Sequence, residues 1–373
     1  MPSILFGTPL SLVTGTTSIQ QVLALSSTTA IAVYAESGDW KAVHLTVNAS
    51  TLAVTKGTAV TLDAAQTATT MGTMELAKWS STEVLAVYQF DDGTKDYRGQ
   101  ILSISGTTIT AETAVDFETG VTYVYPSVAN LAEDKWIAFR SESGGASPTW
   151  QNASVITQSG VGLTLETALN TAGSLSSFLT EIEALSATAA VCLYTNGSAL
   201  TAKLLAISGT TVTLDDSVNL TVGDFYQATG RNQLVKLSAT KLVSSHKYTA
   251  GGDTSRLTVL DIDGATITAG SDFVMPETQP HYICNGSNAN EIMVASSGTA
   301  QLGTYSVSGT TITQDGNEAN IPNTATAAMI DYLGSDVWVG VSVVGSDLET
   351  FGAELGTDYT YTHNTGGLPG SII

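Results

Sequence analysis

Ile104-Ser105-Gly106-Thr107-Thr108-Ile109-Thr110 is the stretch that decides the fold, because it recurs along the chain. Ile207–Thr213 and Val307–Thr313 are nearly identical to it, and Ile262–Thr268 is a close relative. Each copy joins an alternating stretch to a stretch rich in threonine and isoleucine through a Ser-Gly or Asp-Gly pair. Glycine readily adopts the positive φ of a tight hairpin turn, and β-branched residues favour strands. Each copy therefore predicts a β-hairpin.

The hairpin copies are regularly spaced, and three weaker copies complete the series, one before, one between and one after the clear copies. With one marker residue taken from each copy, the steps along the chain are 56, 54, 49, 55, 45 and 47 residues. The markers are Ser50, Gly106, Gly160, Gly209, Gly264, Gly309 and Gly356. Seven markers at this spacing predict a repeat architecture.

An apolar run precedes each hairpin, as in Ala30–Tyr34 and Val84–Tyr88, and is typical of a strand buried on both faces. With a looser strand before the run, each unit holds four strands, which predicts an all-β, seven-bladed β-propeller of four-stranded antiparallel blades. A β-sandwich array and a β-solenoid are the alternatives, but an immunoglobulin-like domain needs ~100 residues. We expect the runs to form the core between blades, through Val33, Val87, Ile137, Val191, Val243, Val294 and Val339.

The start of the chain predicts how the ring closes. Gly7–Leu12 resembles Gly57–Leu62, which lies at the end of a fourth-strand segment. We therefore expect residues 1–16 to supply the outermost strand of the last blade, because this removes an open sheet edge. The rival is that Asp358–Tyr361 completes that blade, since tyrosine and threonine favour strands.

One propeller is expected over residues 1–361, followed by an irregular tail, 362–373, in which glycine and proline disfavour regular structure. The first residues carry neither a basic region nor a long apolar run, so they do not form a secretion signal. No stretch approaches the length of a membrane span, and we expect no membrane insertion. We expect synthesis in the cytoplasm.

The chain is acidic, with 34 Asp and Glu residues against 13 Lys and Arg residues and a formal net charge of −21. Nucleic-acid binding depends on basic side chains that neutralise phosphates, so no nucleic-acid partner is expected. An anionic membrane surface is disfavoured for the same reason. The charge suits solubility or an acidic face offered to a cationic partner.

Catalytic and metal-binding motifs are missing from the sequence. Cys192 and Cys284 lie in apolar or strand-like stretches, which favours buried free thiols, and none of the four histidines has a zinc-binding spacing. There is neither a nucleophile elbow nor a phosphate-binding loop. Turn aspartates such as Asp91 and Asp92 are calcium-ligand types, but they match no calcium loop. We therefore expect no catalytic residue, metal or cofactor, and a protein that is not an enzyme.

Aromatic residues lie beside polar groups in the stretches expected to join the second and third strands of the blades. Trp40, Asp92, Tyr97, Trp150 and Tyr248 belong to this set. Aromatic faces stack on sugar rings and carboxylates bind hydroxyl groups, so these five residues are candidate glycan ligands. The alternative is that the aromatic residues cover the edges of outer strands.

The repeated Ser-Gly-Thr-Thr-Ile-Thr hairpins resemble the repeats of β-propeller proteins in tailed-bacteriophage particles, such as tail, fibre and head-decoration components. That resemblance implies a virion location and a structural or adhesive module. Its partners would be other virion proteins or copies of itself, with a host-surface glycan as a further ligand. The alternative is a free lectin-like or glycosidase-type propeller that acts on carbohydrate, since two carboxylates suffice for glycoside hydrolysis.

Overall fold

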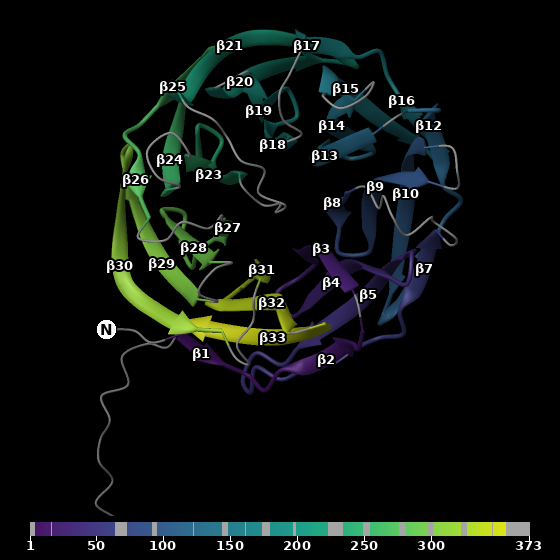
Figure 1. Cartoon of the computed structure of the whole chain (residues 1–373), viewed down its shortest axis with the longest axis vertical. Coiled ribbons are helices and arrows are strands. Elements are labelled where there is room, and N and C mark those ends of the chain that lie inside the picture. The colour runs from purple at the N-terminus through teal and green to yellow at the C-terminus, as the bar shows by residue number, and fades with distance from the viewer. Residues whose placement is uncertain are drawn as a thin grey trace, which may run out of the picture.

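The computed structural model describes a closed ring of β-strands (Figure 1). It covers residues 4–355 except 16, 64–72, 92–94, 122, 144–147, 161, 174–179, 197–198, 223–233, 249–253, 276–280, 297–300, 322–326 and 345. Within these ranges the strands form seven sheets, each of which pairs only antiparallel strands. The predicted seven-bladed β-propeller is confirmed.

Each blade runs outward from an inner strand that faces the ring axis. Blade 1 contains β3 (Thr17–Ala24), β4 (Thr29–Glu36), β5 (Asp39–Val47), β6 (Val54–Lys56) and β7 (Val60–Asp63). Blade 2 contains β8 (Met74–Ser80), β9 (Glu83–Asp91), β10 (Lys95–Ser105), β11 (Thr108–Ala111) and β12 (Val115–Thr119). Blade 3 contains β13 (Tyr123–Ala132), β14 (Lys135–Ser143), β15 (Pro148–Ser159), β16 (Gly162–Leu165) and β17 (Leu169–Gly173). Blade 4 contains β18 (Thr180–Ser186), β19 (Ala189–Asn196), β20 (Ala199–Ser208) and β21 (Thr211–Val222).

The remaining blades follow the same order. Blade 5 contains β22 (Leu234–Ser238), β23 (Lys241–Tyr248), β24 (Thr254–Asp263), β25 (Thr266–Ala269) and β26 (Phe273–Val274). Blade 6 contains β27 (His281–Asn285), β28 (Glu291–Ser296), β29 (Gln301–Ser308) and β30 (Thr311–Asn320). Blade 7 contains β31 (Ala327–Gly334), β32 (Val337–Val344), β33 (Asp347–Leu355), β1 (Ile4–Phe6) and β2 (Leu10–Val13).

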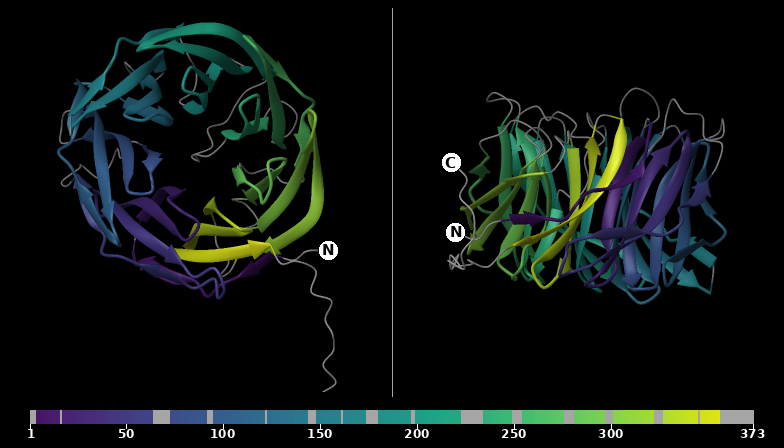
Figure 2. Two further views of the ribbon diagram at one scale, coloured as in Figure 1. Left: turned by 180° about the vertical axis from the view of Figure 1, so that it is seen from behind. Right: turned by 90° about the horizontal axis from the view of Figure 1, so that it is seen from below.

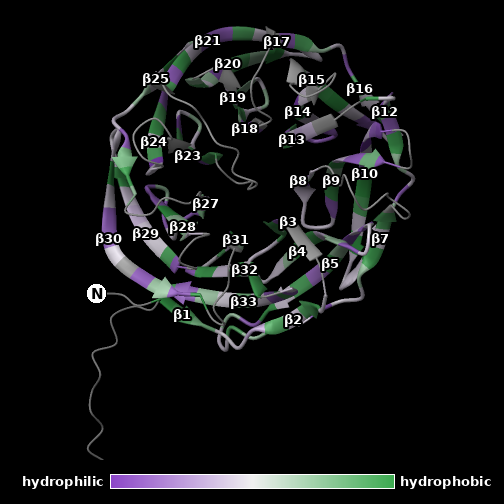
Figure 3. Ribbon diagram, viewed as in Figure 1, coloured by the Kyte–Doolittle hydropathy of each residue, from purple (hydrophilic) through white to green (hydrophobic). Residues whose placement is uncertain are grey.

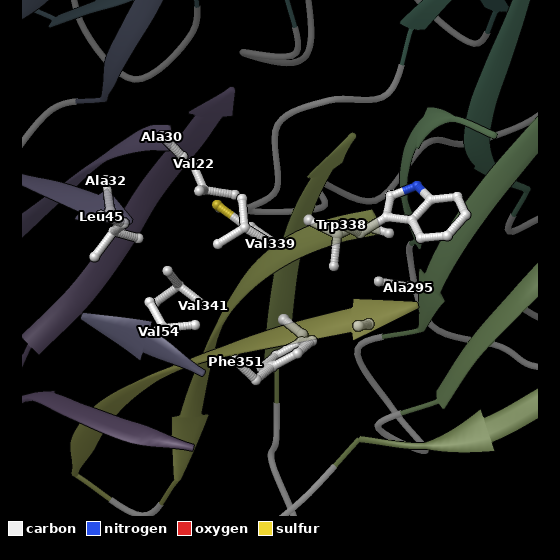
Figure 4. Packing of buried hydrophobic residues seen from close by; sticks show 14 of the residues in the cluster. Val22, Ala30, Ala32, Leu45, Val54, Ala295, Trp338, Val339, Val341 and Phe351 are labelled. Carbon is white, nitrogen blue, oxygen red and sulfur yellow. The ribbon is translucent and has the colours of Figure 1, made fainter. Parts of the chain in front are cut away.

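The second strand of each blade is the core of the fold. All seven residues predicted from the apolar runs, including Val33, Val87 and Val294, are at most 2% exposed. Successive residues of a strand point to opposite faces, so each second strand packs against both neighbouring blades. Figure 4 shows this around β32, where Val339 and Val341 point toward side chains of the first blade and Trp338 lies nearer Ala295.

The repeated hairpin turns have the geometry that the sequence predicts. Gly106, Gly160, Gly209, Gly264 and Gly309 have φ values between 59° and 62°. The weaker first copy has no glycine and turns through a longer loop, residues 48–53, between the paired Val47 and Val54. In this loop the Asn48 side chain accepts hydrogen bonds from the backbone nitrogens of Ser50 and Thr51, at 3.0 and 3.1 Å. Leu52 then takes the positive φ of 57°. The seventh marker, Gly356, lies outside the described residues.

The outer strands differ from the predicted single fourth strand. In five sheets the outer strand is split into two short strands that pair with the same third strand, so those sheets have five strands. Figure 3 shows hydrophilic and hydrophobic residues interleaved along the outer strands β21 and β30. Breaks and polar residues at a sheet edge discourage pairing with another chain.

The N-terminal segment closes the ring, as predicted. Ile4, Leu5 and Phe6 pair with Leu355, Glu354 and Ala353, and β2 pairs with the first half of β33. Asp358–Tyr361, the rival segment, lies outside the described residues, and so does the predicted tail, 362–373. In the part of the chain that the structure describes, no helix is both long and apolar enough to cross a membrane.

Candidate functional site

A cavity lies on the ring axis, where all seven inner strands contribute to its wall. Its volume is about 360 Å³, within the range of small-molecule sites. Figures 1 and 2 show the inner strands arranged around the centre of the ring. The charged residues of the wall are Glu75 and Lys78 on β8, Glu181 and Glu183 on β18, Lys236 on β22 and Asp331 on β31.

Side chains on successive inner strands bind the backbone of the next blade. The Gln21 side chain accepts a hydrogen bond from the Leu76 nitrogen at 2.5 Å. Glu75 accepts one from the Val128 nitrogen at 3.2 Å. Ser127 accepts one from the Ile182 nitrogen, and Asp331 accepts one from the Ala24 nitrogen, at 2.9 and 2.7 Å. Inner strands of neighbouring blades do not pair, so these side chains satisfy amide groups that the sheets leave open.

Glu183 differs from the other channel carboxylates. No hydrogen bond from the described part of the chain reaches its carboxyl group, although Lys236, Glu75 and Asp331, from three other blades, all interact with it electrostatically. Glu183 as a whole is partly buried, but the desolvation of its carboxyl group raises the pKa of Glu183 to about 7, while Lys236 opposes the rise and Glu75 and Asp331 add to it. Burial likewise raises the pKa of Asp331. Like charges held close together in a poorly solvated place disfavour full ionisation.

The channel is suited to a cationic group. Its wall carries four carboxyl groups against two lysines, and Glu75 and Glu181 are 4% and 5% exposed. An ammonium or guanidinium group placed beside Glu183 would favour the ionised carboxylate and form a charge-assisted hydrogen bond with it.

A metal site and a reactive thiol gain no support from the described residues. Within the described ranges, no group of three or more His, Cys, Asp and Glu residues is placed to hold a metal ion. Cys192 and Cys284 are free and buried, as expected, and burial raises the pKa of Cys192 to about 12. The absence of a metal or cofactor stays a prediction.

Two of the five candidate glycan ligands lie in the core. Trp40 and Tyr97 are each 0% exposed. The Trp40 indole nitrogen donates to the carbonyl oxygen of Gln89 at 3.2 Å, in the interface between blades 1 and 2. Tyr97 packs against Phe117, with 5.2 Å between ring centroids, and the Arg140 guanidinium lies 5.3 Å from its ring centre. Neither ring offers a face to a sugar, which corrects the sequence-based assignment.

The other three candidates stay predictions. Asp92 lies outside the described residues. Trp150 is near the start of β15, where its backbone pairs with Glu142, and Tyr248 ends β23 opposite Thr254. The structure places both residues at the strand ends near the connections between the second and third strands, but it does not describe their side chains.

Sequence reasoning missed the channel residues. Gln21, Glu75, Glu183 and Asp331 belong to the looser first strands, which carry no distinctive motif. One signal was available: polar residues recur at a spacing of one unit, at Gln21, Glu75, Ser127 and Glu181. A polar residue repeated in an apolar strand indicates a shared structural role. For Gln21, Glu75 and Ser127 that role is the hydrogen bond to the next blade.

Comparisons with known proteins identify the class, a seven-bladed β-propeller, and no family. No protein-family model matches the chain, and no curated protein matches it. The β-propeller domain of Cps50 (Swd1) from Myceliophteria thermophila is similar with a TM-score of 0.58 and 9% identity, over 94% of this chain and 99% of that one. A Bacteroides fragilis protein provisionally named a 6-phosphogluconolactonase is similar with a TM-score of 0.56 and 9% identity, over 92% and 98%. A Bacteroides uniformis protein with the same provisional name has a TM-score of 0.57 and 9% identity, over 81% and 85%.

These structures correct one expectation. The lack of catalytic motifs suggested that the chain is not an enzyme, but propellers similar to it over most of their length carry enzyme names. A propeller brings together side chains from blades far apart in sequence, so its sites need no local motif. The expectation is therefore contradicted. At this identity the likeness shows the fold alone, and no activity follows from it. The resemblance to bacteriophage particle proteins gains no support from these structures.

Proposed function

We propose that this propeller is a binding module that receives a basic group of a partner protein in its axial channel. The observation that carries the proposal is the cavity in which Glu183 meets Glu75 and Asp331. A lysine or arginine side chain is long and narrow, and a cavity of about 360 Å³ has room for one. The net charge of −21 would also draw a basic partner toward the protein.

A binding module of this kind can be a component of a larger assembly. The resemblance of the hairpin repeats to those of bacteriophage particle proteins suggests a virion as that assembly. A virion role rests on the resemblance of the hairpin repeats alone. It is tested by purifying particles from an infected culture that produces this chain, followed by mass spectrometry. Recovery of the chain at a fixed ratio to other particle proteins would support a virion role, and its recovery only from the particle-free fraction would contradict it.

Channel binding is tested by calorimetry with a hexalysine peptide as the probe. We expect one saturable site, weakened at least tenfold in Glu183→Gln. Asp263→Asn is the matched control, because it removes the same charge from an exposed turn residue. Equal weakening in both variants would mean diffuse attraction to the acidic surface and would overturn the proposal, as would a wild-type protein that does not bind the peptide.

A further inference from the structure

A second property of the channel follows from the position of Glu183 among its neighbours. The wall that includes this carboxyl group carries acidic and basic side chains from four of the seven inner strands. They are Glu75 and Lys78 on β8, Glu181 on β18 itself, Lys236 on β22 and Asp331 on β31, while β3, β13 and β27 add the uncharged Gln21, Asn130, Asn285 and Cys284.

Most of the other channel carboxylates already have a structural task. Glu75 and Asp331 accept backbone hydrogen bonds from blades 3 and 1, and Glu181 has an interaction of its own. Glu183, by contrast, receives no hydrogen bond from the described residues, and its neighbours include two carboxylates and one ammonium group. Its protonation can therefore change without loss of a described hydrogen bond, unlike that of Glu75 or Asp331.

We propose that Glu183 is the proton-linked receptor of the channel: a cationic ligand seats against its carboxylate and expels the proton that it carries when the channel is empty. This inference rests on the proposed function and names the group that recognises the ligand. Lys236 acts as an internal competitor, because its ammonium group already interacts with the carboxylate that the ligand would use.

The sign of the pH dependence follows from linkage. The pKa of Glu183 is raised to about 7 in the empty channel, so the carboxyl group carries a proton below pH 7. A cation binds the ionised form better and lowers that pKa, so protons are released on binding. Affinity should therefore rise with pH, by at most about tenfold per pH unit for one linked proton, and level off above pH 8.

The experiment is calorimetry of hexalysine binding in two buffers of different ionisation enthalpy, from pH 5.5 to 8.5. The α-amino group of the peptide is acetylated, because it would itself titrate near pH 8. The lysine side-chain amines stay protonated in this range, so a buffer-dependent heat reports protons that leave the protein. For the wild type we expect release of about half a proton at pH 7 and almost none at pH 8.5. Glu183→Gln should show no release and weaker binding that does not vary with pH.

Lys236→Met separates a role in recognition from a merely structural one. Lys236 lowers the pKa of Glu183, so its removal should leave more of Glu183 protonated at pH 7 and shift the pH at which binding strengthens upward. Binding by the wild type without proton release, or with equal release in Glu183→Gln, would overturn this inference and leave the proposed function intact. Absence of any hexalysine binding would overturn both.

Discussion

Ile4 lies directly opposite Leu355, so the start of the chain and the last described strand form the outermost pair of blade 7. Ile4 is buried and Leu5, its neighbour, is 43% exposed, as strand alternation requires. Lys56 of blade 1 holds the same closing segment from the other side, through hydrogen bonds to the carbonyl oxygens of Ser11 and Leu12, at 3.0 and 2.6 Å. Ring closure thus joins three segments that lie far apart in sequence.

Closure can be tested with two neighbouring substitutions. Ile4→Asp places a charge in the core between blades and should lower the unfolding temperature by several degrees, because a buried unpaired charge is costly. Leu5→Asp is the matched control and should change it little. Calorimetry of both variants decides the matter: equal unfolding temperatures would show that the β1–β33 pair does not hold the ring together.

The inter-blade core gives a stronger effect. Val87 is fully buried on β9, and a buried valine side chain stabilises the fold by about 1.5–3 kcal/mol. Val87→Ala should lower the free energy of unfolding by about 1–3 kcal/mol in a urea titration, and Val87→Asp should prevent folding. Thr108→Asp, at an exposed position on β11, is the control. A stable Val87→Asp protein would contradict the assignment of β9 to the core.

Gly340 lies so close to Phe351 that there is no room for a side chain at position 340. A Cβ atom at Gly340 would lie 2.3 Å from the Phe351 ring, which is fully buried between β32 and its neighbours. Gly340→Ala should therefore destabilise the protein by about 1–3 kcal/mol, as overpacked cores do. Gly340→Ala combined with Phe351→Leu should recover part of the loss. If Phe351→Leu changes the free energy of unfolding by the same amount with or without Gly340→Ala, the two residues are not coupled.

The fold could be predicted from the sequence because its signals are local and repeated. Each hairpin needs a glycine or an Asn turn, and each second strand needs apolar residues on both faces. The glycan site was predicted less well. Whether an aromatic residue lies in a turn or inside the following strand depends on where the turn ends. Ser37 and Gly38, with φ values of 54° and 90°, make a two-residue turn, so Trp40 falls inside β5 and points into the core. Tyr97 is buried for the same reason, because β10 begins at Lys95.

The axial channel illustrates a different limit. Glu183 and Lys236 are 53 residues apart and belong to different blades, so only ring closure brings them together. The sequence indicates the inner strands, but not which of their polar residues face a common space.

Of the three glycan candidates that remain predictions, Trp150 and Tyr248 carry the aromatic rings. If a sugar stacks on these rings, Trp150→Ala and Tyr248→Ala should each abolish signals that the wild-type protein gives on a glycan array, because stacking supplies much of the contact area. Exposed Thr108→Ala serves as the control. Unchanged array signals in both variants would rule out these two residues as ligands.

Acid sensitivity should arise from the polar cluster in blade 5. His246 is 2% exposed and lies beside Ser244, with 3.3 Å between His246 Nδ1 and Ser244 Oγ. Burial lowers the pKa of His246 to about 4, Asp272 opposes this, and Arg256 adds to it. The unfolded chain therefore binds a proton at higher pH than the folded one, whose histidine stays neutral.

The stability associated with His246 is present above about pH 6.5, the pKa of an unfolded histidine, and is lost as pH falls toward 4. The slope from this one group is at most about 1.4 kcal/mol per pH unit. His246→Gln keeps a polar side chain that does not titrate, so its free energy of unfolding should fall less between pH 6.5 and 4.5 than that of the wild type. Urea titrations across this range measure the difference. Parallel pH profiles for the two proteins would mean that His246 is protonated in the folded state, contrary to its burial beside Arg256.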